Sequence, residues 1–273
     1  MQDKKTKKKQ KAKEGTTLTI DIGSLLTPIA ILLGAVIIAI GIFVSINRSG
    51  TNSIGKDSAT NTIGTDSGAS GDAPQVDSPK AVTNIDDDPI LGNRDTAKIA
   101  IVEFSDYECP FCKRYQEQTR DEIVSKYVDS GDAIMVYRDF PLSFHNPLAT
   151  DEAMAAECVQ DLAGNDKYFQ YSKSIFNTTQ SNGKGMERSK LFDLADNIGV
   201  DGKKIESCVD SGKFAEEINK DIEDGGNAGV TGTPGFVIGV LSDNGSVDGV
   251  NVSGAQPFSV FEQVIEEQLN RTN

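Results

Sequence analysis

The chain has 273 residues and a formal net charge of −14 at pH 7. Residues 1–21 hold seven lysines and three acidic side chains, whereas the remainder of the chain carries 20 basic and 38 acidic ones. This acidic balance argues against nucleic-acid binding by the main part of the chain, and the length suits one domain of ordinary size with appendages.

The absence of charge between Asp21 and Arg48 indicates a membrane-spanning segment at residues 25–46, which are almost wholly apolar. As a helix, a segment of this length crosses a hydrocarbon core of about 30 Å. Lysines precede it and only Arg48 closely follows, so the positive-inside rule places residues 1–24 in the cytoplasm as a basic tail. We therefore expect a single-pass anchor in the cell membrane, with the rest of the chain extracytoplasmic, where disulfides persist. A cleaved secretory signal is the alternative, although the segment is longer than a usual signal core and lacks a small-residue cleavage pattern.

A segment rich in Ser, Gly, Thr, Asn and Asp follows at residues 47–82 and predicts a flexible, disordered linker. The folded domain is expected at residues 83–271. Near its start, Asp86, Asp87 and Asp88 place three carboxylates side by side, but their spacing differs from that of a calcium-binding EF-hand loop. We interpret these residues as a turn that leads into the first core strand.

Hydrophobic patterns predict the elements of this domain in chain order. A β-branched and aromatic run at residues 98–104 predicts a strand, and the helical spacing that follows reaches Tyr127. A second strand is predicted at residues 133–139, and a helical tract at about 146–226. Within that tract we expect helices at residues 146–163, 166–176, 187–198, 202–211 and 213–222, and after it strands at 236–240 and 247–252 and a helix at 257–269. This order predicts an α/β fold with an inserted α-helical subdomain.

Two cysteines, Cys109 and Cys112, stand where the strand at residues 98–104 gives way to a helix. Pro110 suits the first helical position, and the first backbone N–H groups of a helix stabilise an anion placed beside them. We therefore predict that Cys109 has a lowered pKa and acts as the nucleophile and leaving group. Cys112, one turn further on, would resolve a mixed disulfide, and the predicted reaction is thiol–disulfide exchange.

Two other interpretations of the Cys109–Cys112 pair are weaker. A zinc site needs four ligands, and the chain offers one histidine and two further cysteines that are not at metal spacing. An inert structural disulfide across so short a loop would constrain little chain entropy. We expect neither a metal nor another cofactor.

Glu103 and His145 are the other titratable residues of interest. Glu103 lies within an apolar strand, six residues before Cys109. Either it is a buried carboxyl with a raised pKa that exchanges a proton with Cys112, or it points to water, and the sequence pattern leaves both open. His145 is the only histidine, so a metal or Cys–His role is weak and a surface or packing role is expected.

The remaining cysteines, Cys158 and Cys208, lie in the predicted helical tract. Four cysteines allow three pairings, and the local geometry of the motif favours Cys109 with Cys112 and Cys158 with Cys208. A bridge across about 50 residues stabilises a fold by roughly 4 kcal/mol on the chain-entropy model, so a structural role suffices. An electron relay is the alternative, but cysteines inside helices are usually inert.

Three segments resemble the DsbA-like branch of the thioredoxin superfamily: residues 102–112, 137–142 and 229–236. The resemblance covers about residues 83–271 and implies a thioredoxin-like fold. It also implies a cis peptide bond before Pro234, and substrate contacts from the Thr233 backbone and from Pro110 and Phe111.

The resemblance also bears on individual site residues. Glu103 matches an acidic residue of the family, which favours the proton-relay role. Phe111 stands where the strongly oxidising members have a histidine, and Gly235 departs from the larger residue that often follows the cis-proline.

From these observations we expect an extracytoplasmic oxidase that introduces disulfides into reduced exported proteins through Cys109 and Cys112. By family resemblance, a membrane-embedded, quinone-linked partner would reoxidise it. A reductase or isomerase is the alternative within the enzyme class, and a non-catalytic module that binds peptides or copper is the alternative outside it.

Overall fold

The computed structural model describes residues 78–273. The predicted basic tail, the predicted anchor and most of the predicted linker lie outside the described residues. Within residues 78–273, no helix combines the length and the apolar character that a membrane crossing needs.

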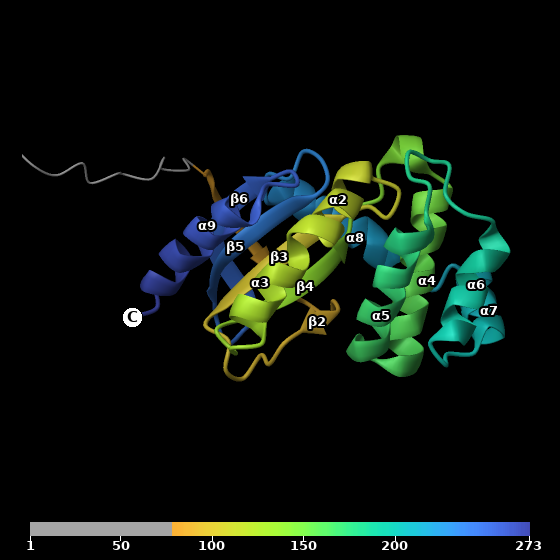
Figure 1. Cartoon of the computed structure of the whole chain (residues 1–273), viewed down its shortest axis with the longest axis horizontal. Coiled ribbons are helices and arrows are strands. Elements are labelled where there is room, and N and C mark those ends of the chain that lie inside the picture. Colours follow the sequence, from red (N-terminus) through yellow and green to blue (C-terminus); the bar gives the residue numbers. More distant parts are fainter. Residues whose placement is uncertain (1–77) are drawn as a thin grey trace, which may run out of the picture. The chain divides into compact units, whose positions relative to one another are not determined.

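A six-stranded mixed sheet forms the centre of the domain (Figure 1). Its strands are β1 (Lys80–Asn84), β2 (Ile90–Leu91), β3 (Ile99–Ser105), β4 (Ala133–Asp139), β5 (Gly235–Leu241) and β6 (Ser246–Ser253). They lie in the order β1-β6-β5-β3-β4-β2, with β3 parallel to β4 and every other neighbouring pair antiparallel. The strand that leads to the cysteines is therefore central.

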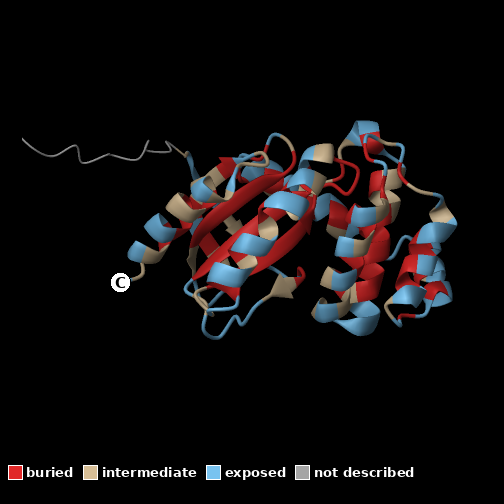
Figure 2. Cartoon of the chain, in the orientation of Figure 1, coloured by how far each residue is buried: buried red, intermediate tan, exposed pale blue. Residues whose placement is uncertain are grey.

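Every residue of β3 and β4 is buried, because helices cover both faces of the sheet (Figure 2). Successive side chains of a strand point to opposite faces. Ile99 and Ile101 therefore pack in one core, whereas Val102 and Phe104 pack in the core on the other face. A strand buried on both faces shows a continuous apolar run, which is the pattern at residues 98–104.

Helices α2 (Pro110–Gln118), α3 (Arg120–Ile123) and α9 (Phe258–Asn270) cover one face of the sheet. A π-helical turn at Val124–Val128 follows α3. The aromatic rings of Tyr115, Phe236 and Phe261 meet under these helices, with centroids 4.7–5.5 Å apart. This packing holds the start of α2 against the sheet.

Helix α8 (Ala215–Asn227) packs on the opposite face. Its Gly225 lies so close to the sheet that an added Cβ would stand 2.8 Å from both Phe104 and Phe140. Earlier in the same helix, Ile218 packs in the core of the helical insertion. Helix α8 therefore joins the insertion to the sheet.

The helical insertion consists mainly of α4 (Leu148–Ala163), α5 (Asn165–Thr178), α6 (Arg188–Asn197) and α7 (Gly202–Ser211). In Figure 1 these four helices lie beyond the β2 edge of the sheet. A disulfide joins Cys158 of α4 to Cys208 of α7, with 6.1 Å between their Cα atoms. The insertion core reaches the cysteine motif through Tyr107, whose ring lies 4.8 Å from that of Phe176.

The structure confirms the predicted α/β fold with a helical insertion and corrects its boundaries. Residues 80–82, predicted as linker, form part of β1, and the helix after Cys112 is interrupted at Thr119. Helix α8 continues to Asn227 rather than ending at residue 222. Gly225 and Gly226 have low helix propensity, but burial of Gly225 against the sheet outweighs that local preference.

Candidate active site

Cys109 and Cys112 lie at the start of α2, where β3 delivers the chain from the centre of the sheet. Cys109 immediately precedes the helix in an extended conformation, and Pro110 occupies the first turn. Both thiols are free, with Cys109 3% exposed and Cys112 fully buried. The chain is thus in its dithiol form, and Cys109 is the more accessible sulfur.

The pKa values of the two thiols are shifted in opposite directions. The hydrogen bond from the Cys112 thiol lowers the pKa of Cys109 to about 6, and the backbone N–H groups of Phe111 and Cys112 act in the same direction. Burial raises the pKa of Cys112 well above its ordinary value, and its hydrogen bond to Cys109 and the charge of Cys109 raise it further. At neutral pH, Cys109 is therefore the thiolate and Cys112 holds the proton.

The loop before β5 faces Cys109. The Thr233–Pro234 peptide bond is cis, as the family resemblance implied. Sγ of Cys109 lies 3.3 Å from the Thr233 carbonyl oxygen, to which it donates a hydrogen bond in its protonated form. Gly235 follows because an added Cβ would lie 2.7 Å from the side chain of Val230. The departure from a larger residue at this position thus has a steric reason in the neighbouring loop.

Glu103 lies beneath the motif on β3 and is fully buried, which decides between the two readings of this residue. Burial raises its pKa to about 7, while a 3.1 Å hydrogen bond from Gln116 favours the ionised form. Ser105, two residues on and hence on the same face of the strand, influences both Glu103 and Cys112. The Ser105 hydroxyl has no hydrogen-bond partner of standard geometry. Its proximity nevertheless lowers the pKa of Glu103 and of Cys112, against the larger effect of burial.

Asp106 ties the cysteine loop to the segment that precedes α4. Its carboxylate accepts hydrogen bonds of 2.7 Å from the Glu108 N–H and 2.8 Å from the Leu142 N–H. The same carboxylate lies 2.7 Å from Nδ1 of His145, in a 3₁₀ turn at Ser143–His145. His145 is therefore not a surface residue: it is 4% exposed and lines the hollow beside Cys109.

Glu108 fixes the motif to the helical insertion. Its fully buried carboxylate pairs with the hydroxyl of Thr179 and accepts a 2.8 Å hydrogen bond from the Gly185 N–H. Beside it, burial raises the pKa of Glu152 in α4 to about 9, and the charges of Glu108 and Asp106 add to the shift. Glu152 is therefore protonated at neutral pH.

Sequence reasoning did not identify the roles of Ser105, Asp106, Glu108 and Glu152. Asp106 and Glu108 lie three residues and one residue before Cys109, but their partners lie tens of residues away. No local pattern specifies such pairings.

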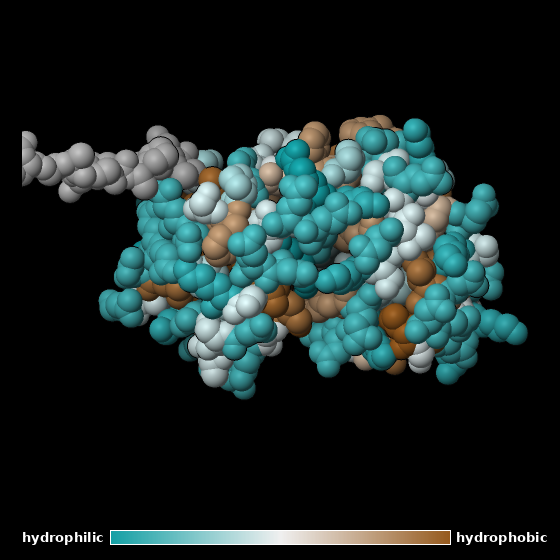
Figure 3. Space-filling model, viewed as in Figure 1, coloured by the Kyte–Doolittle hydropathy of each residue, from teal (hydrophilic) through white to brown (hydrophobic). Residues whose placement is uncertain are grey.

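A groove of about 330 Å³ opens beside Cys109. Phe111 and Phe144 stand on its wall, with exposed fractions of 53% and 73%. The lining residues are Cys109, Pro110, Phe111, Leu142, Phe144, His145, Asn182, Thr231, Gly232 and Thr233. In Figure 3 the visible face is mostly hydrophilic, with apolar residues at its upper edge and in separate patches across its lower half. The groove therefore offers an apolar surface next to the reactive sulfur.

Sequence comparisons identify relatives of this chain. The family model described as Thioredoxin matches residues 84–266. A protein of Rickettsia felis named for protein-disulfide oxidoreductase activity is 26% identical over 205 residues, which are 72% of this chain and 68% of that protein. The Na(+)/H(+) antiporter NhaA 1 of Mycobacterium sp. strain KMS is 29% identical over 167 residues, but the match covers only 25% of the antiporter.

Solved structures show the same fold. Oxidised BdbD from Bacillus subtilis has a TM-score of 0.61 and 21% identity, and the match covers 71% of this chain and all of BdbD. DsbA2 from Pseudomonas aeruginosa has a TM-score of 0.53 and 25% identity, with 66% of this chain and 92% of DsbA2 covered. Together with the free cysteine pair at the start of α2, these matches show that the chain belongs to the thioredoxin family and is a DsbA-like thiol–disulfide oxidoreductase.

Proposed function

We propose that this oxidoreductase works as a dithiol oxidase, which introduces disulfides into exported proteins. The observation that carries the proposal is the stabilised Cys109 thiolate next to a protonated Cys112. Stabilising the thiolate stabilises the reduced enzyme, so the Cys109–Cys112 disulfide becomes a stronger oxidant.

The proposed cycle begins with the oxidised pair. A substrate thiolate attacks Sγ of Cys109, the Cys109–Cys112 bond breaks, and Cys112 leaves with the electron pair. A second substrate thiolate then attacks the substrate sulfur of the mixed disulfide, and Cys109 leaves as a thiolate. One substrate disulfide forms, and the enzyme ends as the dithiol seen in the structure.

Cys112 needs a proton when it leaves, because burial disfavours its thiolate. Glu103 is suited to deliver that proton, since burial raises its pKa to about 7 and both protonation states are then accessible at neutral pH. Ser105 lies on the same face of β3 and influences both groups. We infer that Glu103 exchanges the proton with Cys112 in the region of Ser105.

The groove beside Cys109 would hold an extended substrate segment. Thr233 presents its backbone next to the cis peptide bond, and its carbonyl already faces the Cys109 sulfur. Pro110 and Phe111 supply an apolar wall. Because hydrogen bonds to the substrate backbone do not depend on its side chains, such a groove would accept unfolded segments of many sequences.

The location and the redox partner of the enzyme are also part of the proposal. The apolar segment at residues 25–46 and the lysines before it support a cell-membrane anchor with the catalytic domain outside. A dithiol oxidase must be reoxidised after each turnover, and a membrane-embedded, quinone-linked oxidase is the class of partner that an anchored enzyme could reach.

Equilibration with glutathione tests the direction of transfer. The full chain is incubated at defined ratios of reduced to oxidised glutathione, and the fraction of Cys109–Cys112 disulfide is measured after acid quenching. We expect a potential well above the value of about −270 mV typical of thioredoxin. In parallel, stoichiometric oxidised enzyme should convert a reduced, unfolded model protein to its disulfide form.

The same experiment separates the alternatives. A potential near that of thioredoxin, with no net transfer to the reduced substrate, would make the chain a reductase or isomerase instead. Copper titration of the reduced chain, together with failure to oxidise any substrate, would favour the binding module.

A further inference from the structure

The loop between α5 and α6, residues 179–187, is built around the buried carboxylate of the residue before the reactive cysteine. The hydroxyl of Thr179 donates a hydrogen bond to one oxygen of the Glu108 carboxylate, and the N–H of Gly185 donates one of 2.8 Å to the other. The N–H of Asn182 donates a hydrogen bond of 2.7 Å to the Glu108 carbonyl. The start, the middle and the end of the loop are therefore all attached to one residue of the cysteine motif.

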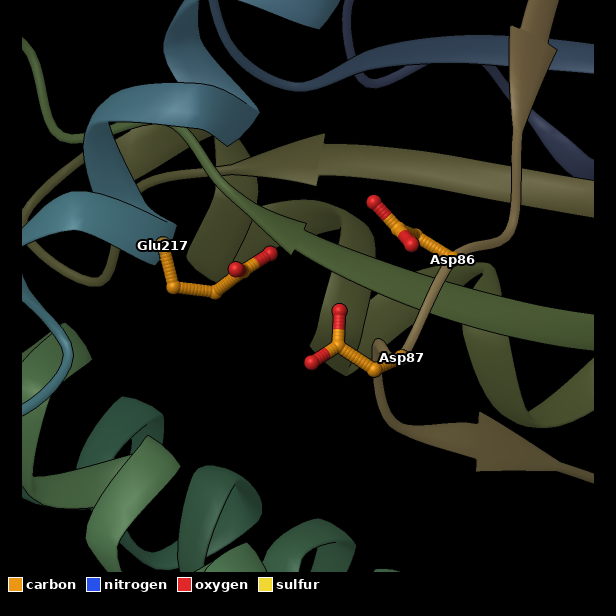
Figure 4. Close-up of side chains that lie close together, drawn as sticks. All are labelled: Asp86, Asp87 and Glu217. Carbon is orange, nitrogen blue, oxygen red and sulfur yellow. The ribbon is translucent and has the colours of Figure 1, made fainter.

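The burial of Glu108 requires these hydrogen bonds. Other carboxylates of this domain that lie close together have access to water: Figure 4 shows Asp86, Asp87 and Glu217, of which the first two are exposed and the third is half-buried. Glu108 is fully buried, so donors of the protein must replace water around its carboxylate. The α5–α6 loop supplies two of these donors, and the carboxylate in turn fixes the conformation of the loop.

The fixed loop turns through two residues with a left-handed backbone. Ser181 and Asn182 have φ angles of 60° and 58°, a region that residues other than glycine rarely adopt. Gly183 follows with φ 69°, and an added Cβ there would lie 3.6 Å from the carbonyl oxygen of Phe144, on the wall of the groove. Strained residues of this kind cluster at functional sites, where the surrounding structure holds them in place.

This turn brings Asn182 to the groove beside Cys109. Asn182 is exposed and lines the groove together with Thr233. The two residues reach the motif from different parts of the molecule: Asn182 contacts the residue before Cys109, and the Thr233 carbonyl lies 3.3 Å from Sγ of Cys109. A side-chain amide both donates and accepts hydrogen bonds, as a peptide group does. The groove therefore has hydrogen-bonding groups from two separate elements next to the reactive sulfur.

We propose that Asn182 is a specificity-determining residue, whose side-chain amide binds the substrate backbone next to the reacting cysteine, and that Thr179 is a positioning residue that acts through it. The inference rests on the proposed transfer to unfolded chains and narrows the substrate class. In an extended chain, successive backbone N–H groups point to opposite edges. A segment that pairs with Thr233 by one edge and with Asn182 by the other must have both edges free. Substrate cysteines would therefore lie in extended single chains rather than in strands of a folded sheet, where at least one edge is already paired.

The rate at which a thiol reduces the Cys109–Cys112 disulfide tests this contact. The oxidised full chain is mixed with an unfolded peptide that contains one cysteine, and the remaining enzyme disulfide is quantified after acid quenching. Asn182→Gly removes the amide and leaves a residue that adopts a φ angle of 58° without strain. We expect this variant to react about three- to tenfold more slowly with the peptide, because it loses a hydrogen bond to the substrate. With 2-mercaptoethanol, which has no peptide backbone, it should react as fast as wild type.

Two further variants separate the amide from the loop that carries it. Thr179→Val removes the hydroxyl that hydrogen-bonds to Glu108 and to the Ser181 N–H, so the turn should loosen and the rate with the peptide should fall. Because Thr179 acts through Asn182, adding this change to Asn182→Gly should slow the reaction by less than about 1.5-fold. Lys184→Ala is the matched control and should react like wild type, because Lys184 is an exposed residue of the same loop that does not line the groove.

Methylated peptides test which edge of the substrate Asn182 binds. An N-methyl group is placed either on the cysteine or on the residue after it, so the two peptides block opposite edges. Methylation of one edge should slow the reaction of wild type but not that of Asn182→Gly. Methylation of the other edge should slow both proteins, since it blocks pairing with Thr233.

Three results would overturn the inference. If the peptide reacts equally fast with wild type and with Asn182→Gly, the side chain does not contact the substrate. If the variant is also slower with 2-mercaptoethanol, the substitution has changed the reactivity of Cys109 itself. If Lys184→Ala is as slow as Asn182→Gly, the effect belongs to the loop in general. These rates concern the first exchange step alone, whereas a failure of the oxidase proposal would appear in the equilibrium with glutathione.

Discussion

The two cysteine pairs of this chain contain the same functional group in opposite settings. Cys109 and Cys112 are free thiols one turn apart at the start of α2, whereas Cys158 and Cys208 form a bond that joins α4 to α7. The hydrogen bond from Cys112 and, to a lesser extent, the backbone N–H groups at the helix start stabilise the Cys109 thiolate, while Cys158 is fully buried inside α4. Position within a helix, rather than residue type, therefore separates a reactive pair from a structural one.

Replacing one sulfur of the reactive pair should have the largest effect. Cys109→Ser removes the more accessible sulfur of the reactive pair, so disulfide transfer to a reduced protein should fall to the uncatalysed rate. The double variant Cys158→Ser with Cys208→Ser should keep at least half of the wild-type transfer rate. Thiol quantification over time measures both, and strong loss in the double variant would show that the second pair takes part in electron transfer.

The free energy of unfolding should depend on the structural pair rather than on the reactive pair. The Cys158–Cys208 bond closes a separation of 50 residues, and its removal should lower the free energy of unfolding by about 4 kcal/mol. Urea unfolding of the double variant, with Cys109–Cys112 held in one redox state, measures the loss. A loss below about 1 kcal/mol would contradict the structural role assigned to this bond.

The buried carboxyl of Glu103 should make the free energy of unfolding of the chain depend on pH. The folded chain keeps the Glu103 proton up to about pH 7, whereas the unfolded chain releases it near pH 4.5. Between these two pH values the unfolded state binds fewer protons than the folded state. The contribution of Glu103 to the free energy of unfolding therefore falls by about 3 kcal/mol as pH rises. Glu103→Gln should lose this contribution, while that of Glu152 remains, so its stability should fall less steeply with pH than that of wild type. It should also slow disulfide transfer, since it cannot exchange the proton of Cys112.

A matched variant controls for the removal of charge. Glu117 lies on α2 but is exposed, so Glu117→Gln should follow the wild-type stability at every pH. Urea midpoints between pH 4 and pH 8 measure all three proteins. If Glu103→Gln and wild type show the same pH profile, the buried carboxyl is not the group that titrates.

The smallest effect is expected at the groove wall. Phe144 is 73% exposed beside Cys109, and Phe144→Ala should raise KM for an unfolded substrate by about threefold with little change in kcat. Leu162→Ala is the comparison, because Leu162 is an exposed apolar residue near the end of α4 and does not line the groove. Equal KM for the two variants would mean that the groove does not hold substrate.

Local pattern was enough for much of the fold. The strand at Ala133–Asp139 coincides with its prediction, and the helices of the insertion match to within a few residues except α8. Buried runs of β-branched residues and helical spacing are short-range signals, so they survive without knowledge of the partners. The end of α8 depended on Phe104 and Phe140 across the interface, and short-range signals do not contain that information.

The candidate site divides in the same way. The position of Cys109 at a helix start follows from Pro110 and the preceding strand, and with it the prediction of a stabilised thiolate. Which face Glu103 occupies, and that Asp106 holds His145, depended on contacts between elements far apart in sequence. His145 was assigned to the surface or to packing because its carboxylate partner lies 39 residues earlier.

The amino-acid sequence by itself determined the order of strands and helices, the reactive cysteine motif and its chemistry, because hydrophobic period and helix-end effects act within a few residues. Only the tertiary structure decided which carboxylates are buried, such as Glu103 on β3 and Glu108 and Glu152 where the cysteine motif meets the helical insertion. The protonation of a carboxylate depends on burial and on neighbouring charges, and folding creates both.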